Sequence, residues 1–238
     1  MEKRRSPPGS GPARPVVLDS KQTRDLDEQT ISVARVPALI LMERAARAIS
    51  SSALRRFPQS LRVGARILAG SGNNGGDGVA SGRILQSWGF PVEIWRTFAP
   101  RPQCGTSDSD WQWQIASCFQ GATFVSSEEA DSRLEADPPY PGLWIDAILG
   151  TGFKGPLRDR LTRLIRILNR RCEAVLAIDV PSGMDADTGF PSPVAVHATA
   201  TVTLGALKPG LVAAQGLEYS GPVEVADIGW PRRLRVEC

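Results

Sequence analysis

Three segments of the chain combine polar side chains with glycines, and the first of them is Gly70–Gly78, with the sequence Gly-Ser-Gly-Asn-Asn-Gly-Gly-Asp-Gly. Glycines let backbone N–H groups approach a ligand closely, and a helix that starts there adds partial positive charge suited to a phosphate. The spacing differs from Gly-x-Gly-x-x-Gly. Asp77 either caps the helix or accepts hydrogen bonds from ligand hydroxyls, and the carbonyls of Asn73 and Asn74 could coordinate a cation. We interpret the segment as a dinucleotide or phosphate loop rather than a plain capped turn.

The second segment is Asp146–Pro156, which begins at the end of an apolar run and contains three glycines. A carboxylate at the carboxyl end of a strand is a common catalytic or ligand-binding position in open α/β sheets. A simpler interpretation, in which Asp146 caps the turn, fits the same residues.

The third segment is Ile178–Gly189, where Asp179 follows another apolar run and Ser182 comes three residues later. Both would add oxygen ligands to the same rim of the sheet. Residues 185–189 are similar in sequence to the start of a calcium-binding loop, but the glutamate that ends such a loop is missing. We therefore interpret them as a polar turn. A serine hydrolase is disfavoured because Gly-x-Ser-x-Gly is absent and His197 is the only available base.

Apolar runs that end at turn residues predict strands, and amphipathic stretches between them predict helices. The predicted strands are 65–69, 92–95, 143–147, 174–180, 201–204 and 223–225. Predicted helices run from a cap at Ser20 to about residue 34, after Pro37 through residue 49, over 79–88 and over 157–170. Between residues 100 and 141 the pattern indicates only a helix through Phe119 and then an acidic, proline-rich stretch. Alternating strands and helices predict an α/β fold, a Rossmann-like three-layer α/β/α sandwich with a mostly parallel central sheet.

Length and composition limit the possible domain organisation, binding partners and cellular location. The 238 residues suit one domain, expected over residues 18–238, after a basic Pro/Gly-rich tail over residues 1–17. The net charge of +3 and the absence of a basic stripe argue against a nucleic-acid partner. No apolar run is long enough for a signal peptide or membrane span, so we expect a cytoplasmic protein. The four scattered cysteines fit reduced thiols, although a Cys172–His197 pair stays formally open.

The three segments together, in this order, resemble the YjeF N-terminal family, the NAD(P)H-hydrate epimerases. Gly72–Gly78 matches the family's GNNGGDG, Asp146–Gly155 its DAxxGTGxxG, and Asp179–Gly183 its D[IV]PSG. Leu207–Gly210 and Asp227–Gly229 extend the match, which covers roughly residues 18–231.

The resemblance implies epimerisation of the R and S forms of hydrated NADH and NADPH (NADHX and NADPHX), with a separate dehydratase as functional partner and a homodimer as the assembly. It implies one potassium ion per subunit, held by Asn74, Asp146 and Ser182. Asp146 is our candidate for catalysis, because inverting a hydroxyl-bearing carbon needs a group that gives and takes a proton. The substrate-binding residues that it implies are Asn73, Asn74, Gly75, Gly76, Asp77, Gly150, Thr151, Gly152, Phe153, Lys154, Gly155, Pro156 and Asp179.

The sequence departs from the family's usual pattern near residue 40, where Arg35 and Ala46 stand at two positions that are commonly glycine. A non-catalytic binding or scaffold module on the same fold is the main rival, and the intact aspartates and glycines of the three segments argue against it. An ordinary NAD-dependent oxidoreductase is disfavoured by the irregular glycine loop and the lack of a Tyr–Lys or His arrangement.

Overall fold

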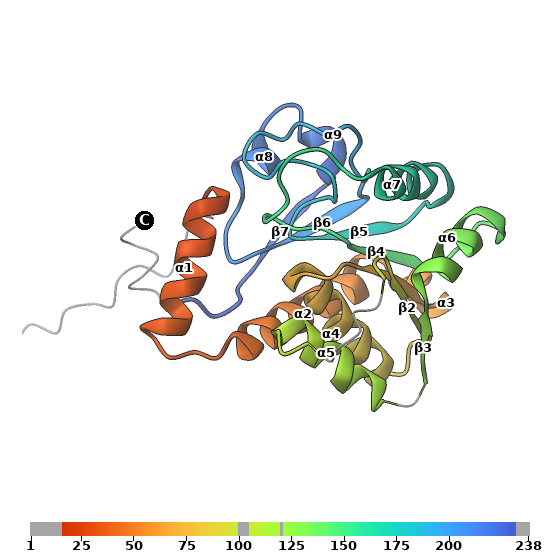
Figure 1. Ribbon diagram of the computed structural model, residues 1–238, viewed down its shortest axis with the longest axis horizontal. Coiled ribbons are helices and arrows are strands. Elements are labelled where there is room, and N and C mark those ends of the chain that lie inside the picture. Colours follow the sequence, from red (N-terminus) through yellow and green to blue (C-terminus); the bar gives the residue numbers. More distant parts are fainter. Residues whose placement is uncertain (1–15, 100–104, 120, 232–238) are drawn as a thin grey trace, which may run out of the picture.

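A computed structural model describes residues 16–99, 105–119 and 121–231, and its centre is a seven-stranded sheet in the order β3-β2-β1-β4-β5-β6-β7 (Figure 1). All six strand pairs are parallel. The strands are β1 (Ala65–Ala69), β2 (Val92–Arg96), β3 (Ala122–Val125), β4 (Leu143–Ala147), β5 (Val175–Ile178), β6 (Ala200–Leu204) and β7 (Val223–Ala226). The predicted α/β fold with a parallel sheet is therefore confirmed.

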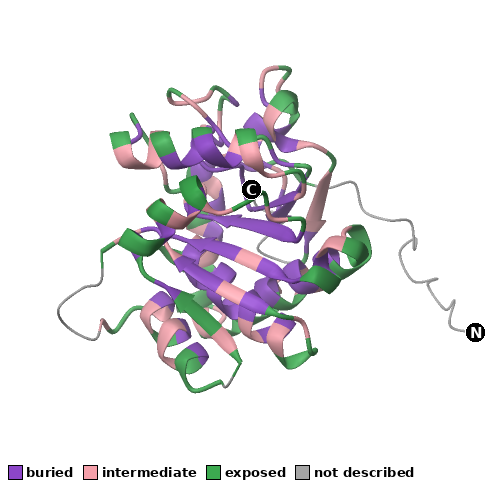
Figure 2. Ribbon diagram, turned by 90° about the vertical axis from the view of Figure 1, so that its right-hand side faces the viewer, coloured by how far each residue is buried: buried purple, intermediate pink, exposed green. Residues whose placement is uncertain are grey.

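Helices cover both faces of this sheet (Figure 1). They are α1 (Ser20–Ser32), α2 (Ala38–Arg56), α3 (Pro58–Val63), α4 (Asn73–Ser87), α5 (Asp108–Ser117), α6 (Ser127–Ala136), α7 (Asp159–Arg171), α8 (Pro209–Val212) and α9 (Leu217–Ser220). Successive strand residues point to opposite faces. In β1, Ile67 packs in the cluster that contains residues of α2 and α4, whereas Leu68 packs with α6 and α7. The inner strands are mostly buried between these two helical layers, whereas the edge strands β3 and β7 are less buried (Figure 2).

The chain order places a switch point between β1 and β4. The chain runs outward from β1 to β3 and then crosses back to place β4 beside β1, on the side away from β2. Loops that leave the carboxyl ends of β1 and β4 diverge at such a point, which is where open α/β sheets bind ligands. Two of the three polar segments of the sequence follow these two strands.

Two local predictions need correction, and some elements were missed. The helix α4 begins at Asn73 rather than near Val79, so the glycine segment forms its first turns. The cap of α1 is Asp19 rather than Ser20, because the Asp19 carboxylate accepts a hydrogen bond from Gln22 N at 2.7 Å in a capping box. Strand β3 and helix α6 were not predicted. The acidic stretch from Glu128 is the body of α6, with Glu128 and Glu129 in its first turn.

Contacts with the C-terminal part of the chain hold helix α1 and the residues before it in place. Val17 pairs with Leu207, and the Leu18 N–H donates to the Leu207 carbonyl at 2.8 Å, so the segment before α1 is joined to the loop that follows β6. Trp230 Nε1 donates to the Asp27 carboxylate at 2.7 Å. The rest of the predicted tail, residues 1–15, lies outside the described residues.

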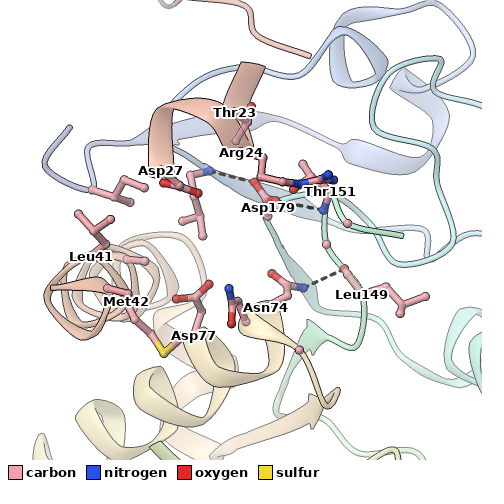
Figure 3. A pocket seen from close by; sticks show the side chains of 18 of the residues that line it. Thr23, Arg24, Asp27, Leu41, Met42, Asn74, Asp77, Leu149, Thr151 and Asp179 are labelled. Carbon is pink, nitrogen blue, oxygen red and sulfur yellow. Dashed lines mark hydrogen bonds between the residues drawn. The ribbon is translucent and has the colours of Figure 1, made fainter. Parts of the chain in front are cut away.

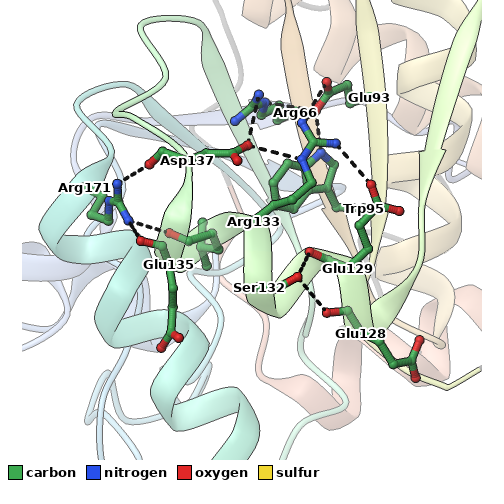
Figure 4. Close-up of polar contacts among 11 residues, drawn as sticks. Arg66, Glu93, Trp95, Glu128, Glu129, Ser132, Arg133, Glu135, Asp137 and Arg171 are labelled. Carbon is green, nitrogen blue, oxygen red and sulfur yellow. Dashed lines mark hydrogen bonds and ion pairs between the residues drawn. The ribbon is translucent and has the colours of Figure 1, made fainter.

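A polar and aromatic cluster ties α6 to the sheet (Figure 4). Arg66 and Glu93 are opposite each other on β1 and β2, and Arg66 Nε lies 3.0 Å from the Glu93 carboxylate. The Arg66 guanidinium also lies 4.0 Å from the ring centre of Tyr140, and Arg133 of α6 reaches Glu93 at 3.3 Å. The hollow beside it measures about 10 Å³, which suits at most one water molecule. We interpret this cluster as structural.

Within the described ranges, no helix is long and apolar enough to cross a membrane. The described cysteines, Cys118 and Cys172, are free, whereas Cys104 and Cys238 lie outside the described residues. Burial raises the pKa of the Cys172 thiol to about 12. Because a nucleophilic cysteine needs a lowered pKa, the Cys172–His197 alternative is not supported.

Candidate functional site

A cavity of about 640 Å³ opens at the switch point, between α1, α2, the start of α4 and the loop after β4 (Figure 3). Polar residues from all three predicted segments line it, together with apolar side chains of α2. Its volume lies within the usual range for small-molecule and cofactor sites. The structure therefore brings the three segments to one place.

The predicted substrate-binding residues divide into two groups. Those that line the cavity are Asn73, Asn74, Asp77, Gly150, Thr151, Gly152, Phe153, Lys154 and Asp179. Those that do not line it are Gly75, Gly76, Gly155 and Pro156, and the same is true of Asp146 and Ser182.

The glycines at the start of α4 serve close packing. A Cβ atom on Gly75 would lie 1.9 Å from the Gly70 carbonyl oxygen, and one on Gly76 would lie 2.8 Å from the end of the Met42 side chain. Both glycines are buried. They let the first turns of α4 press against the end of β1 and against α2, which is a different reason for glycine than the approach of a ligand that we expected.

Asp146 is fully buried at the end of β4 and is held by Ser182. Its carboxylate accepts hydrogen bonds from the Ser182 hydroxyl at 2.6 Å, from Ser182 N at 2.8 Å and from Ile148 N at 3.3 Å. Burial raises the pKa of Asp146 to about 6, and the hydrogen bonds from Ser182 oppose the shift. The carboxyl group therefore titrates near neutral pH, where proton exchange is easiest.

Asn74 supplies an oxygen atom with no partner. Its Nδ2 donates to the Leu149 carbonyl at 2.8 Å, while Oδ1 is buried and accepts no hydrogen bond within the part of the chain that the structure describes. The Ser182 hydroxyl also contacts Leu149, accepting from its N–H at 2.9 Å. A buried amide oxygen without a partner is costly unless something fills its lone pairs. The loop around Leu149 thus gathers an amide, a hydroxyl and a carbonyl oxygen near the Asp146 carboxylate.

Asp179 is neutralised by a lysine. Lys208 is fully buried, and its ammonium donates to Asp179 Oδ1, to Thr203 Oγ1 at 3.0 Å and to the Leu204 carbonyl at 2.8 Å. Asp179 also accepts from Thr151 N at 3.4 Å and has a φ of 67°, a strained backbone conformation for a residue other than glycine. The strained position holds a carboxylate between the loop after β4 and the buried lysine.

Asp77 faces the cavity from α4 (Figure 3). It lies in the second turn of the helix, whose N-cap position is Gly72, so the hypothesis that Asp77 caps the helix is wrong. Burial, followed by the charges of Asp179 and Asp27, raises the pKa of Asp77 well above its usual range. Among the described residues no group donates a hydrogen bond to it, which leaves it free to meet a ligand.

The sequence analysis missed several residues of the cavity. From α1 come Thr23, Arg24 and Asp27, from α2 Leu41 and Met42, and from the C-terminal part Lys208 and Trp230. The one available signal was Lys208, which stands inside the matched Leu207–Gly210 motif. The α1 residues carried none, because their place at the cavity depends on pairing with a segment far along the chain.

Comparisons with known proteins agree with this geometry. The family described as "YjeF-related protein N-terminus" matches residues 38–210. A protein of Limosilactobacillus fermentum named NAD(P)H-hydrate epimerase is 37% identical over 88% of this chain and 95% of its own length. One of Oenococcus oeni with the same name is 35% identical over 90% and 97%.

A longer protein and a solved structure are also similar to this chain. The bifunctional NAD(P)H-hydrate repair enzyme Nnr of Moorella thermoacetica is 35% identical over 92% of this chain, which spans 41% of that protein. The crystal structure of yeast ynu0 is similar with a TM-score of 0.71 and 26% identity, covering 82% of each chain. The resemblance seen in the three motifs is confirmed, and the chain belongs to the family of YjeF-related protein N-termini.

Proposed function

We propose that this protein is an NAD(P)H-hydrate epimerase, which interconverts the R and S hydroxyl epimers of NADHX and NADPHX. The observation that carries the proposal is the cavity of about 640 Å³ at the switch point, which is lined by residues of all three motif segments. Relatives that are 35–37% identical over nearly their whole length carry this name. The substrate-binding residues given by the sequence analysis remain part of this proposal.

Asp146 is the proposed catalytic carboxylate. The reaction needs a reversible break at the carbon that bears the hydroxyl, and a carboxyl group with a pKa of about 6 can give and take a proton near neutral pH. Ile148 and Leu149, in the loop that follows Asp146, line the cavity, whereas Asp146 itself does not.

The proposal includes one bound potassium ion, and the residues present fit it. Asn74, Asp146 and Ser182 would hold the ion, with the Leu149 carbonyl beside them. Hard cations prefer oxygen ligands, and the unpartnered buried oxygen of Asn74 is an available one. When bound, the ion would supply fixed positive charge that offsets the buried carboxylate. The loop of residues 148–154 would then be held close to the start of α4.

Three finer points belong to the same proposal. The bifunctional relative is named as a repair enzyme, which supports a link to a dehydratase that consumes the S epimer. The two described thiols are free, in keeping with the expected cytoplasmic location. A homodimer stays a prediction from the family resemblance.

The test supplies an epimer mixture of NADHX to an S-specific dehydratase, with potassium, and follows the R form that remains. We expect the protein to remove the R form far faster than it disappears spontaneously. Asp146→Asn should lower that rate by roughly 10²-fold or more. Asp131→Asn, which changes a carboxylate on α6 bound to Arg160, is the matched control and should leave the rate unchanged.

Two outcomes would contradict parts of the proposal. If the R form persists while the dinucleotide still binds, the protein is a binding module on this fold rather than an epimerase. If Asp146→Asn epimerises as fast as the unchanged protein, the catalytic assignment of Asp146 is wrong.

A further inference from the structure

The cavity is lined by more acidic than basic side chains, although the ligand of the proposed function is an anion. Asp27, Asp77, Asp108 and Asp179 line it, against Arg24, Lys154 and Lys208. Dinucleotide phosphates carry negative charge and are bound in proteins by cations and N–H groups. A positive group of this cavity that is not already paired with a carboxylate would suit such a phosphate.

The two lysines are already engaged by carboxylates. Lys208 is buried, and its three hydrogen bonds go to Asp179, Thr203 and Leu204. Lys154 lies 2.9 Å from the carboxylate of Asp185 and 2.8 Å from that of Asp187. One ammonium between two carboxylates leaves no net positive charge at that position.

Arg24 differs from both lysines. Within the described ranges its guanidinium has no carboxylate at ion-pair distance and no hydrogen-bond partner, and the residue is exposed at the cavity. Figure 3 shows its side chain extending from α1 toward Thr151. At Gly152, in the same loop, an added Cβ would meet nothing within 4 Å, so the loop borders open space there. Arg24 and the backbone of this loop thus face a common volume.

The position of Arg24 is fixed by contacts that do not involve its own side chain. Ser20 N and Oγ each donate to the Asp187 carboxylate at 2.7 Å, and Asp187 in turn holds Lys154 of the loop. Leu26 and Thr30 are fully buried on the other side of α1. The helix therefore carries Arg24 to a defined distance from the loop, as a preorganised binding group requires.

We propose that Arg24 binds a phosphoryl group of the dinucleotide and so sets substrate affinity, an inference that rests on the proposed function. A guanidinium presents a rigid fork of N–H donors that matches phosphate oxygens. The phosphoryl group belongs either to the diphosphate bridge, common to both substrates, or to the 2′-phosphate, present only in NADPHX.

The test compares the unchanged protein with Arg24→Gln and Arg24→Lys, using NADHX and NADPHX as substrates. We expect Arg24→Gln to raise KM about 10- to 100-fold with little change in kcat, since a charge-assisted hydrogen bond is lost on binding. Arg24→Lys should restore part of the affinity. A rise for both substrates identifies the diphosphate, and a rise for NADPHX alone identifies the 2′-phosphate.

Lys21→Gln is the matched control, because Lys21 is an exposed cation of the same helix that pairs with Asp25 and lies outside the cavity lining. It should leave both KM values unchanged. Calorimetric titration with ADP-ribose and its 2′-phosphate separates this inference from the epimerase proposal. If the unchanged protein binds a probe more tightly than Arg24→Gln but epimerises nothing, the inference stands and the proposed function fails. Equal binding or equal KM for the unchanged protein and Arg24→Gln, or no binding of either probe, overturns the inference.

Discussion

Two carboxylates at the ends of neighbouring strands, Asp146 at the end of β4 and Asp179 directly after β5, have opposite electrostatic surroundings. Asp179 has the ammonium of Lys208 beside it, so its charge is balanced by the protein itself. Asp146 has only neutral donors from Ser182 and Ile148, and burial raises its pKa to about 6. The Asp179 carboxylate is fixed by its ion pair with Lys208. The charge of the Asp146 carboxylate has no such partner, so a proton or a bound cation can neutralise it.

The largest expected effect comes from removing the lysine that pairs with Asp179. Lys208→Met should lower the free energy of unfolding by about 3–5 kcal/mol, because it leaves the buried Asp179 carboxylate unpaired. Urea denaturation measures it, and the double variant Asp179→Asn with Lys208→Met should recover part of the loss. A loss below about 1 kcal/mol would mean that Asp179 is not neutralised by this lysine.

The next effect is the pH dependence of the free energy of unfolding, which the buried Asp146 carboxyl group contributes. The folded-state pKa of Asp146 is raised from 3.8 to about 6, so between these values the folded state binds more protons than the unfolded state. Stability contributed by this group is therefore fully present below the unfolded pKa of 3.8 and is lost, by about 3 kcal/mol in all, as the pH rises through 6 to about 7.

Asp146→Asn should lack this loss, as measured by urea denaturation at several pH values in tetramethylammonium chloride. Replacing that salt by potassium chloride at equal ionic strength should reduce the loss in the unchanged protein, because a bound cation favours the carboxylate. Superimposable pH profiles for the unchanged protein and Asp146→Asn would contradict the raised pKa.

The smallest expected effect comes from removing the hydrogen bond between Ser182 and Asp146. Ser182→Ala removes the 2.6 Å hydrogen bond to Asp146 and should cost about 1.5–3 kcal/mol at pH 7, where the carboxylate is charged. At pH 4 the cost should shrink, because the protonated acid gains less from the donor. Ser132→Ala, on the exposed face of α6, is the control and should show no such dependence on pH.

The sequence predicted the five inner strands and the edge strand β7, because their apolar runs end at polar or turn residues. It missed β3, whose four residues lie at the edge of the sheet with Phe124 exposed, so that its pattern resembles a loop. It placed the start of α4 too late because the five glycines of Gly70–Gly78 indicate a turn, whereas all of them except Gly72 permit close packing. The predicted oxygen ligands Asn74, Asp146 and Ser182 do gather around Leu149. The pairing of Lys208 with Asp179 could not be predicted, since it joins residues 29 positions apart through the tertiary fold.

The hydrogen bond from Trp230 to Asp27 spans 203 positions of the chain. Contacts of such long sequence separation form late, because a large loop must close before they can contribute. During synthesis, α1 leaves the ribosome first but has no Leu207 or Trp230 to dock on until nearly the whole chain has followed. The sheet can thus assemble around β1 and β4 while the cavity still lacks a wall. We expect pulse-labelled hydrogen exchange to find α1 gaining protection after the strands, so that ligand binding appears only at the last step of folding.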